Sequence, residues 1–596
     1  MKFNNLRELI RIFDFVGKKK GLYFIFLQFV SIFSSMLDTI SVGAIVPFIA
    51  IVSNPNEMMN SNKVKYFMQL LNINDSHELI KIITVLFIAI VILVAIVKWG
   101  QNYLNLRLTN QIASQLAFKL FNTALHQPYI LHTQRNSSQV MFVVSRATEV
   151  LNLVINPVVL FINSFFTIVF ISIFLILLNP LLISTTLSII LLFYFIVAFI
   201  TKGIIKKESL MLSDSSIKLT KSMQEGLGGI RDILLDGTQQ YFSENFNKQD
   251  LILRKSTVKI NLITNTPNIV IQTVGIAAIA ILVSILGDDN KINSGLPLMG
   301  ALAFGYLRIS PALQNVYSSW VLIKNGQVNM NRVIDFLNEA DLINISKSVT
   351  QPLIFTNEIK LKNISFRYSD NLPFAIKNLD LEIKKGERIG LVGKTGSGKS
   401  TLCDIMMGLL STTNGSLQID NTVISQNNMR SWQNHIAHVP QVIYLSDGTI
   451  AENIAFGVSK ENINYAKVEI AAQKAQIAET IASLGDGYQT LVGERGIRLS
   501  GGQRQRLGIA RALYKQADVI FLDEATSALD DETESDLMNA IEGLDNDLTI
   551  IMVAHRLTTL KNCNRILELN KGKIMQYESY ELFMNKNQKT AIFQVN

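Results

Sequence analysis

The chain has 596 residues, of which 48% are hydrophobic, and it carries a formal net charge of +8. This length is too great for one domain, and a mean hydropathy of +0.28 is too high for an ordinary soluble protein. Because the basic residues flank long apolar runs, the charge does not indicate a nucleic-acid binder. Cys403 and Cys563 both fall in the less apolar C-terminal part, which argues against a disulfide framework and favours a reduced, cytosolic setting.

The composition changes along the chain and predicts four regions. Residues 1–20 are charged, with apolar residues at helical spacing, and predict an amphipathic helix on the cytosolic membrane surface. Residues 21–325 hold the long apolar runs and predict a transmembrane domain. Residues 326–350 are the expected linker, and residues 351–596 have the composition of a soluble domain.

Six stretches are apolar and long enough to cross a bilayer, which requires about 20 residues. The segments after the second and fourth stretches are long, polar, helical in period and rich in Lys and Arg. The positive-inside rule therefore predicts that both termini and these segments are cytosolic. The six stretches lie at 22–52, 80–99, 151–178, 181–201, 262–286 and 296–323, with tight turns expected at 179–180 and 287–290.

Asp38 and Arg308 lie inside predicted spans, and Lys98 lies near the end of another. Ionisable groups in a membrane are costly, so all three are candidate substrate-binding residues. The two cations suggest recognition of an anionic head group, such as a pyrophosphate on a lipid. A buried hydrogen bond or an Asp–Arg pair is the structural alternative for Asp38 and Arg308.

The outer loop at 53–79 is longer than a turn requires. Its apolar residues predict one face of a helix, which either lies on the outer leaflet or packs against neighbouring protein. The residues of this face are Val64, Phe67, Met68, Leu70 and Leu71.

The soluble domain contains a phosphate-binding loop, GKTGSGKS, at 393–400. A buried strand is predicted before it at 388–392 and a helix after it at 401–410. The glycines let backbone N–H groups surround phosphate oxygens, Lys399 reaches the β- and γ-phosphates, and Ser400 offers its hydroxyl to Mg²⁺. Tyr368 offers a ring for stacking on adenine. The predicted nucleotide-binding residues are Tyr368, Gly393, Lys394, Thr395, Gly396, Ser397, Gly398, Lys399, Ser400 and Thr401.

Further polar residues complete a predicted hydrolytic site. An apolar run ends in Asp523 and Glu524, as expected of a buried strand that delivers carboxylates to a metal. Glu524 is expected to orient or deprotonate the attacking water, and His555, at the end of another predicted strand, to contact the γ-phosphate. The predicted catalytic residues are Glu524, His555 and Gln441, and the predicted Mg²⁺ ligands are Ser400, Gln441 and Asp523.

A second anion-binding pattern, LSGGQ, lies at 499–503. Two glycines beside a serine at the start of a helix can bind phosphate. Because this pattern is too far along the chain to belong to the first loop, it suggests that the site is completed by dimerisation. Its residues are Leu499, Ser500, Gly501, Gly502 and Gln503.

These motifs together resemble the ATP-binding cassette family, and six spans before one cassette resemble its exporter half-transporters. The resemblance rests on GKTGSGKS, LSGGQ, VIFLDE at 519–524, SALD at 527–530 and His555. It implies an α-helical six-span transmembrane domain followed by an α/β P-loop cassette. It also implies a pair of cassettes in which each ATP lies between residues 393–400 of one copy and 500–503 of the other. Asp530 would communicate across the dimer, and residues 129–133 and 228–237 match the two coupling helices.

The resemblance implies an ATP- and Mg²⁺-dependent exporter or flippase, working as a homodimer in a bacterial inner membrane. Residues 225–237 and 304–314 look similar to bacterial flippases of polyprenyl-diphosphate-linked oligosaccharides, so a lipid-linked glycan is the expected cargo. Lipid A, another lipid, a hydrophobic drug or a peptide is the alternative cargo. An ATP-gated channel or sensor is the alternative from another class, whereas a soluble cassette acting on DNA or ribosomes conflicts with the six spans.

Overall fold

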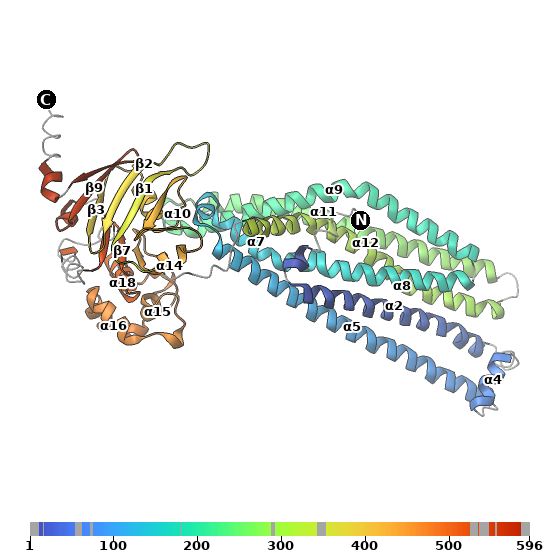
Figure 1. The fold of residues 1–596 in the computed structure, drawn as a ribbon. Helices are drawn as coiled ribbons and strands as arrows, with labels where there is room; N and C mark the ends of the chain where they lie inside the picture. Colours follow the sequence, from blue (N-terminus) through green and yellow to red (C-terminus); the bar gives the residue numbers. More distant parts are fainter. Residues whose placement is uncertain are drawn as a thin grey trace. The chain divides into compact units, whose positions relative to one another are not determined.

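The computed structural model describes residues 11–15, 17–53, 62–71, 75–178, 180–287, 292–342, 353–524, 534–535, 547–554, 557–577 and 579–585. The chain divides into two compact units. The first comprises Met1–Gln127 and Arg135–Asn344, and the second comprises Pro128–Gln134 and Ile345–Asn596. Figure 1 shows the elements of each unit.

Long helices make up most of the first unit, and each of the six predicted apolar stretches coincides with one of them (Figure 1). The third stretch begins slightly earlier, in the π-helical turn before its helix. Four described segments have the length and composition of membrane spans: Lys19–Ser53, Ser76–His126, Ser137–Leu178 and Ile183–Gly228. The fifth and sixth predicted stretches lie on the two remaining long helices. The long helices are α2 (Lys18–Ser53), α5 (Ser76–His126), α8 (Asn156–Leu178), α9 (Pro180–Gly228), α11 (Gln239–Gly287) and α12 (Ile292–Leu342).

Several helices extend well beyond the predicted spans into polar sequence, which confirms that the segments between spans are helical. Two short helices coincide with the expected coupling segments, and one of these, α6, belongs to the second unit. The shorter helices are α4 (Asn62–Leu71), α6 (Tyr129–Gln134), α7 (Ser137–Val150) and α10 (Ile230–Asp236), and a π-helical turn (Leu151–Ile155) joins α7 to α8.

The N-terminal segment and α4, the helix of the predicted outer loop, pack against neighbouring helices through apolar residues. Residues 11–15 are helical, and Phe13 packs in one cluster with Phe24 of α2. On α4, Met68 is buried beside Ile51 and Leu79, and Val64 packs against the same cluster. The described part of α4 therefore packs on protein. The side chains of Phe67, Leu70 and Leu71 lie outside the described residues.

The second unit is an α/β domain with two sheets in its described residues (Figure 1). One has the order β10-β9-β3-β8-β7-β6 and is parallel except for β10 at its edge; the other is antiparallel, with the order β2-β1-β4-β5. The strands are β1 (Glu358–Phe366), β2 (Ile376–Lys384), β3 (Arg388–Val392), β4 (Asn414–Ile419), β5 (Thr422–Val423), β6 (Ile436–Val439), β7 (Val519–Asp523), β8 (Thr549–Val553), β9 (Arg565–Asn570) and β10 (Lys573–Tyr577). The helices are α13 (Lys399–Met406), α14 (Met429–Asn434), α15 (Ile450–Ile454), α16 (Tyr465–Lys474), α17 (Ala478–Ala482) and α18 (Gly501–Tyr514).

The larger sheet is buried on both faces, as parallel sheets generally are. Along β7, Val519 and Phe521 belong to a core that includes α13 and the smaller sheet. Ile520 and Leu522 belong to a second core, formed with α15, α16 and α18. Because successive side chains of a strand point to opposite faces, α13 and α18 cover opposite faces of this sheet.

A close helix contact in the first unit depends on glycine. A β carbon on Gly326 of α12 would lie 2.7 Å from Leu153 Cβ and 2.7 Å from Val154 Cγ2, in the π-helical turn. The absence of a side chain at Gly326 therefore allows α12 to approach the turn.

We predict that Gly326→Ala lowers the free energy of unfolding by about 1–2 kcal/mol, because overpacking exceeds the gain in helix propensity. Gly203→Ala on α9 is the matched control, since its β carbon meets no described atom within 4 Å. This control is predicted to leave stability unchanged or raise it by up to about 1 kcal/mol. Thermal unfolding of the purified proteins tests both, and equal midpoints for the two variants would contradict the packing argument.

Candidate functional site

The parallel strands bring the predicted nucleotide residues to one edge of the larger sheet. In the order β3-β8-β7-β6, neighbouring strands are parallel, so their carboxyl ends lie together. The phosphate loop follows β3, Glu524 follows β7 and Gln441 lies just beyond β6. Ligand sites in open α/β sheets form at such carboxyl ends. His555 lies outside the described residues, but β8, the strand before it, lies between β3 and β7.

The phosphate loop has a backbone that side chains would obstruct. Gly393 has φ +150°, and a β carbon there would lie 2.4 Å from the carbonyl oxygen of Leu569. Gly398 has φ +105°, and its β carbon would lie 2.9 Å from the carbonyl oxygen of Ala375. Glycine is therefore needed at both positions.

Lys399 lies across this loop at the start of α13. Its Nζ donates to the carbonyl oxygens of Gly393 at 2.8 Å and Lys394 at 3.3 Å. Ser397 is buried, whereas Lys394, Thr395, Gly396 and Ser400 are exposed. The loop thus has exposed residues at the strand edge, while the buried Lys399 ammonium is bonded to the loop's own carbonyl oxygens. Glycine-rich backbone beside a lysine is the arrangement of a phosphate site.

Glu524 and Gln441 meet at the same edge. The Gln441 Nε2 donates to the Glu524 Oε2 at 2.6 Å. Glu524 has φ +49°, a left-handed conformation that is uncommon for a residue with a side chain, and its N–H donates to the Val553 carbonyl. Such backbone strain is often found at functional sites. The predicted base and the predicted metal-sensing amide are therefore already in contact.

Tyr368 lies beside the start of α13. Its hydroxyl is 3.0 Å from the Thr401 hydroxyl, and its ring packs edge-on against Phe366 at 5.0 Å. Gln134 of α6 donates through Nε2 to the Tyr368 carbonyl oxygen at 2.9 Å. Ile130 of α6 packs against the core that contains α13. The first coupling segment is thereby connected to a predicted adenine-binding residue.

Two acidic residues near this edge, Asp404 and Asp523, repel each other. Burial and the neighbouring charge of Asp523 raise the pKa of Asp404 to about 6. Burial, Asp404 and Tyr368 together raise the pKa of Tyr129 on α6. A divalent cation beside Asp523 would relieve this repulsion, so the donor set fits a hard cation with oxygen ligands. The sequence motifs did not indicate a role for Asp404.

The second anion-binding pattern forms the beginning of α18. Ser500 Oγ accepts from the Gln503 N–H at 3.2 Å, and the Ser500 N–H donates to Gln503 Oε1 at 2.9 Å, which makes a capping box. Leu499, before it, is buried. Gly501 and Gly502 open the helix, so their N–H groups belong to its positive end. Asp530 lies outside the described residues.

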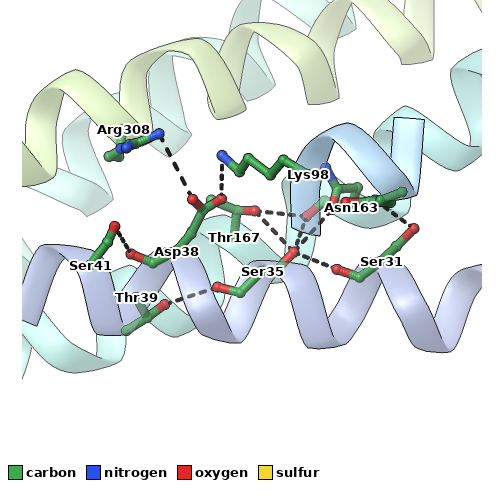
Figure 2. A network of polar contacts seen from close by, with 10 residues as sticks. Ser31, Ser35, Asp38, Thr39, Ser41, Lys98, Asn163, Thr167 and Arg308 are labelled. Carbon is green, nitrogen blue, oxygen red and sulfur yellow. Dashed lines mark hydrogen bonds and ion pairs between the residues drawn. The ribbon is translucent and has the colours of Figure 1, made fainter. Parts of the chain in front are cut away.

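The three ionisable residues of the predicted spans meet in the first unit (Figure 2). Asp38 Oδ2 is 2.7 Å from Lys98 Nζ, and Asp38 Oδ1 is 3.8 Å from an Arg308 amino group. Asp38 is almost fully buried, whereas the Lys98 and Arg308 side chains are 38% and 31% exposed. The structural alternative of an Asp–Arg pair is therefore realised in part, with Lys98 as the nearer cation.

A polar network continues from this cluster along α2 (Figure 2). Ser35 Oγ donates to the Asn163 carbonyl oxygen at 3.0 Å, and Thr167 Oγ1 donates to Ser35 Oγ at 3.1 Å. Gln101 Nε2 donates to Ser31 Oγ at 2.9 Å. The sequence analysis did not identify these uncharged residues, because single polar side chains within apolar runs carry little signal.

Comparisons with known proteins identify the family of the two domains. The ABC transporter transmembrane region matches residues 22–308, and the ABC transporter family matches residues 376–527. The chain is 27% identical over 502 residues to the ATP-dependent lipid A-core flippase of Cupriavidus pinatubonensis, covering 83% of both chains. It is 32% identical over 378 residues to the flippase of the same name from Photobacterium profundum, covering 62% of this chain and 63% of the relative.

A solved bacterial Atm1-family ABC exporter with ATP bound has a TM-score of 0.77 at 21% identity, covering 96% of both chains. The fold is thus a helical membrane domain followed by an α/β nucleotide-binding cassette. The chain belongs to the ABC transporters, and within them it is an exporter-type half-transporter. It is a multi-pass membrane protein that binds ATP and couples ATP hydrolysis to transport.

The raised pKa of Asp404 predicts a pH-dependent stability. Because its folded-state pKa of about 6 exceeds the ordinary 3.8, the protonated carboxyl favours folding at low pH, and this contribution is lost as pH rises through 6. The full shift corresponds to about 3 kcal/mol, which partial exposure reduces to about 1 kcal/mol. Asp404→Asn should therefore raise the unfolding midpoint at pH 7.5 but not at pH 4 in thermal scans without nucleotide or Mg²⁺. A gain of equal size at both pH values would contradict this account.

Proposed function

We propose that two copies of the chain form an ATP-driven flippase for an amphipathic lipid with an anionic head group of the lipid A type. The observation that carries the cargo proposal is the cluster of two cations around one buried carboxylate in the membrane domain. ATP binding would close two cassettes, the coupling helices would transmit this movement to the spans, and hydrolysis would reset them.

In the cassette, the proposed chemistry uses the residues at the strand edge. Lys399 and the loop backbone would hold the phosphates, and Tyr368 would stack on adenine. Asp523 and Ser400 would hold Mg²⁺, which when bound would neutralise part of the triphosphate charge. Glu524 would orient the attacking water and accept its proton, while the Gln441 amide keeps that carboxylate in place. His555 remains the proposed contact to the γ-phosphate.

Dimerisation is proposed because the two predicted anion-binding elements lie on opposite faces of the larger sheet within one chain. The phosphate loop starts α13 on one face of the larger sheet, and LSGGQ starts α18 on the opposite face.

The second expected coupling helix also has a large exposed apolar surface. Leu227, Leu234 and Leu235, in and beside α10, are 73%, 61% and 74% exposed. Exposed leucines this close together favour docking on another protein surface, and a second copy supplies one, together with LSGGQ.

For the cargo, three full charges leave the membrane cluster with a formal excess of one positive charge. Asp38 lowers the cost of holding both cations in an apolar setting, while their partial exposure leaves them reachable by a ligand. A phosphate on a lipid could bind both cations through charge-assisted hydrogen bonds. The same chemistry suits a pyrophosphate, such as that of the lipid-linked glycan expected from the resemblance of residues 225–237 and 304–314.

The relatives favour a different lipid. The similar proteins named above are lipid A-core flippases, which fit the lipid alternative of the sequence analysis better than a polyprenyl-diphosphate glycan. We therefore propose a lipid A-type glycolipid as cargo. We place the protein in a bacterial inner membrane, with both termini and the cassette in the cytosol, from the distribution of basic residues.

The proposed hydrolytic roles predict two distinct defects. Glu524→Gln should retain ATP binding but hydrolyse it at least about 100-fold more slowly, because the water loses its base. Lys399→Ala should instead weaken nucleotide binding, since the phosphates lose their cation. ATPase assays with a fluorescent nucleotide titration separate the two effects. Normal ATPase activity in both variants would overturn the assignment.

The cargo proposal predicts that Arg308→Leu reduces lipid A transport about tenfold, because one charge-assisted contact is lost. Arg308→Lys, which keeps the charge, should retain most of it. Flipping and ATPase stimulation in proteoliposomes should be compared across lipid A, a lipid-linked glycan, a drug and a peptide. Unchanged lipid A flipping in Arg308→Leu would refute charge recognition. A preference for the glycan would favour the lipid-linked glycan that the sequence analysis expected as cargo. ATP-dependent ion conductance without flipping would favour a channel.

A further inference from the structure

A pocket in the first unit lies away from the Asp38 cluster. It is formed where the beginning of α2 lies beside the middle of α5 (Figure 1), and its volume is about 850 Å³. This is within the range of about 300–1,000 Å³ found for small-molecule sites. Lys20 of α2 lies about 27 Å along the helix from Asp38, at 1.5 Å per residue. The pocket residues used below are Lys20, Tyr23, Phe26, Leu104, Arg107 and Gln111.

The polar and apolar residues of this pocket are segregated. Lys20 Nζ donates to Gln111 Oε1 at 2.7 Å, and Arg107 lies one helical turn before Gln111 on α5. Arg107 is exposed, and the described lining contains these two cations and no carboxylate. Tyr23, Phe26 and Leu104 form an apolar wall. Tyr23 and Phe26 are each 60% exposed, so the wall is open to its surroundings.

The sequence pattern around the pocket suggests that it lies at the boundary between membrane and cytosol. The apolar run of α2 starts just after Lys20. The N-terminal helical segment packs Phe13 beside Phe24 and reaches Gly21, whose β carbon would lie 3.7 Å from Phe13 Cβ. A basic end next to an apolar wall at the beginning of a span is the arrangement expected at a membrane–water interface. The positive-inside rule assigns this end to the cytosolic leaflet.

We propose that this pocket binds an anionic phospholipid of the cytosolic leaflet. The phosphate would lie between Lys20 and Arg107, with Gln111 as a further donor. The acyl chains would cover Tyr23, Phe26 and Leu104. Three features favour this occupant over a protein segment. The charge matches an anionic head group, the apolar wall is exposed, and the cations lie where the apolar run of α2 begins. This lipid is a resident of the pocket and not the transported molecule.

The test is a titration of the purified full-length protein with phosphatidylglycerol, followed by native mass spectrometry and by thermal unfolding. Phosphatidylcholine is the uncharged comparison. Lys20→Ala combined with Arg107→Ala should weaken phosphatidylglycerol binding about thirty-fold and remove its stabilising effect. Lys20→Arg combined with Arg107→Lys should retain both. The matched control, Lys202→Ala combined with Lys206→Ala, removes the same charge from exposed positions on α9 and should behave like wild type.

Four results would overturn the proposal. The first is equal phosphatidylglycerol affinity in the alanine double variant and wild type. The second is binding of phosphatidylcholine as tight as that of phosphatidylglycerol, and the third is displacement of the lipid by inorganic phosphate at a concentration similar to that of the lipid. The fourth is a changed oligomeric state in the alanine double variant, which would make this face an interface between copies. None of these experiments measures cargo transport, so they test the lipid proposal independently of the flippase proposal.

Discussion

The parallel sheet of the cassette is the constraint on which the nucleotide chemistry depends. Its strand order places the phosphate loop, Glu524 and Gln441 at one edge. The same sheet separates α13 from α18, because each helix needs its own apolar face to cover. A chain folded in this way holds the two predicted anion-binding elements on opposite faces. The proposed dimer follows directly, since a second copy can bring the missing element to each loop.

The membrane domain is governed by the cost of placing charge in an apolar setting. Asp38 offsets that cost by contacting both Lys98 and Arg308, and the surrounding hydroxyl and amide groups extend the polar region along α2. The same reasoning applies in a milder form at Lys20 and Arg107, where the proposed membrane interface would hydrate the charges. Cations within the predicted spans and cations near their ends therefore support two separate proposals, cargo recognition and a resident lipid.

The sequence could predict those features that depend on neighbours along the chain. Apolar runs predicted β3 and β7, and glycine spacing predicted the phosphate loop. The helix expected after it at 401–410 is present, but α13 begins and ends earlier, at Lys399 and Met406. Contacts between distant residues could not be predicted, because they depend on how helices pack. The Lys98 partner of Asp38, the charge of Asp523 acting on Asp404, and the link from Gln134 to Tyr368 are of this kind. The cargo was also underdetermined, since cations recognise a phosphate and not the sugar or lipid attached to it.

The proposal that two copies share each site can be tested most directly with mixed dimers. One copy would carry Lys399→Ala and the other Gly501→Glu, which puts a repelling charge at the start of α18 but keeps the Ser500–Gln503 capping box. Each variant alone should be inactive as a homodimer. If the site is shared, purified mixed dimers contain one intact site, and their ATPase activity should be restored. Mixed dimers as inactive as either homodimer would contradict a site built from two copies.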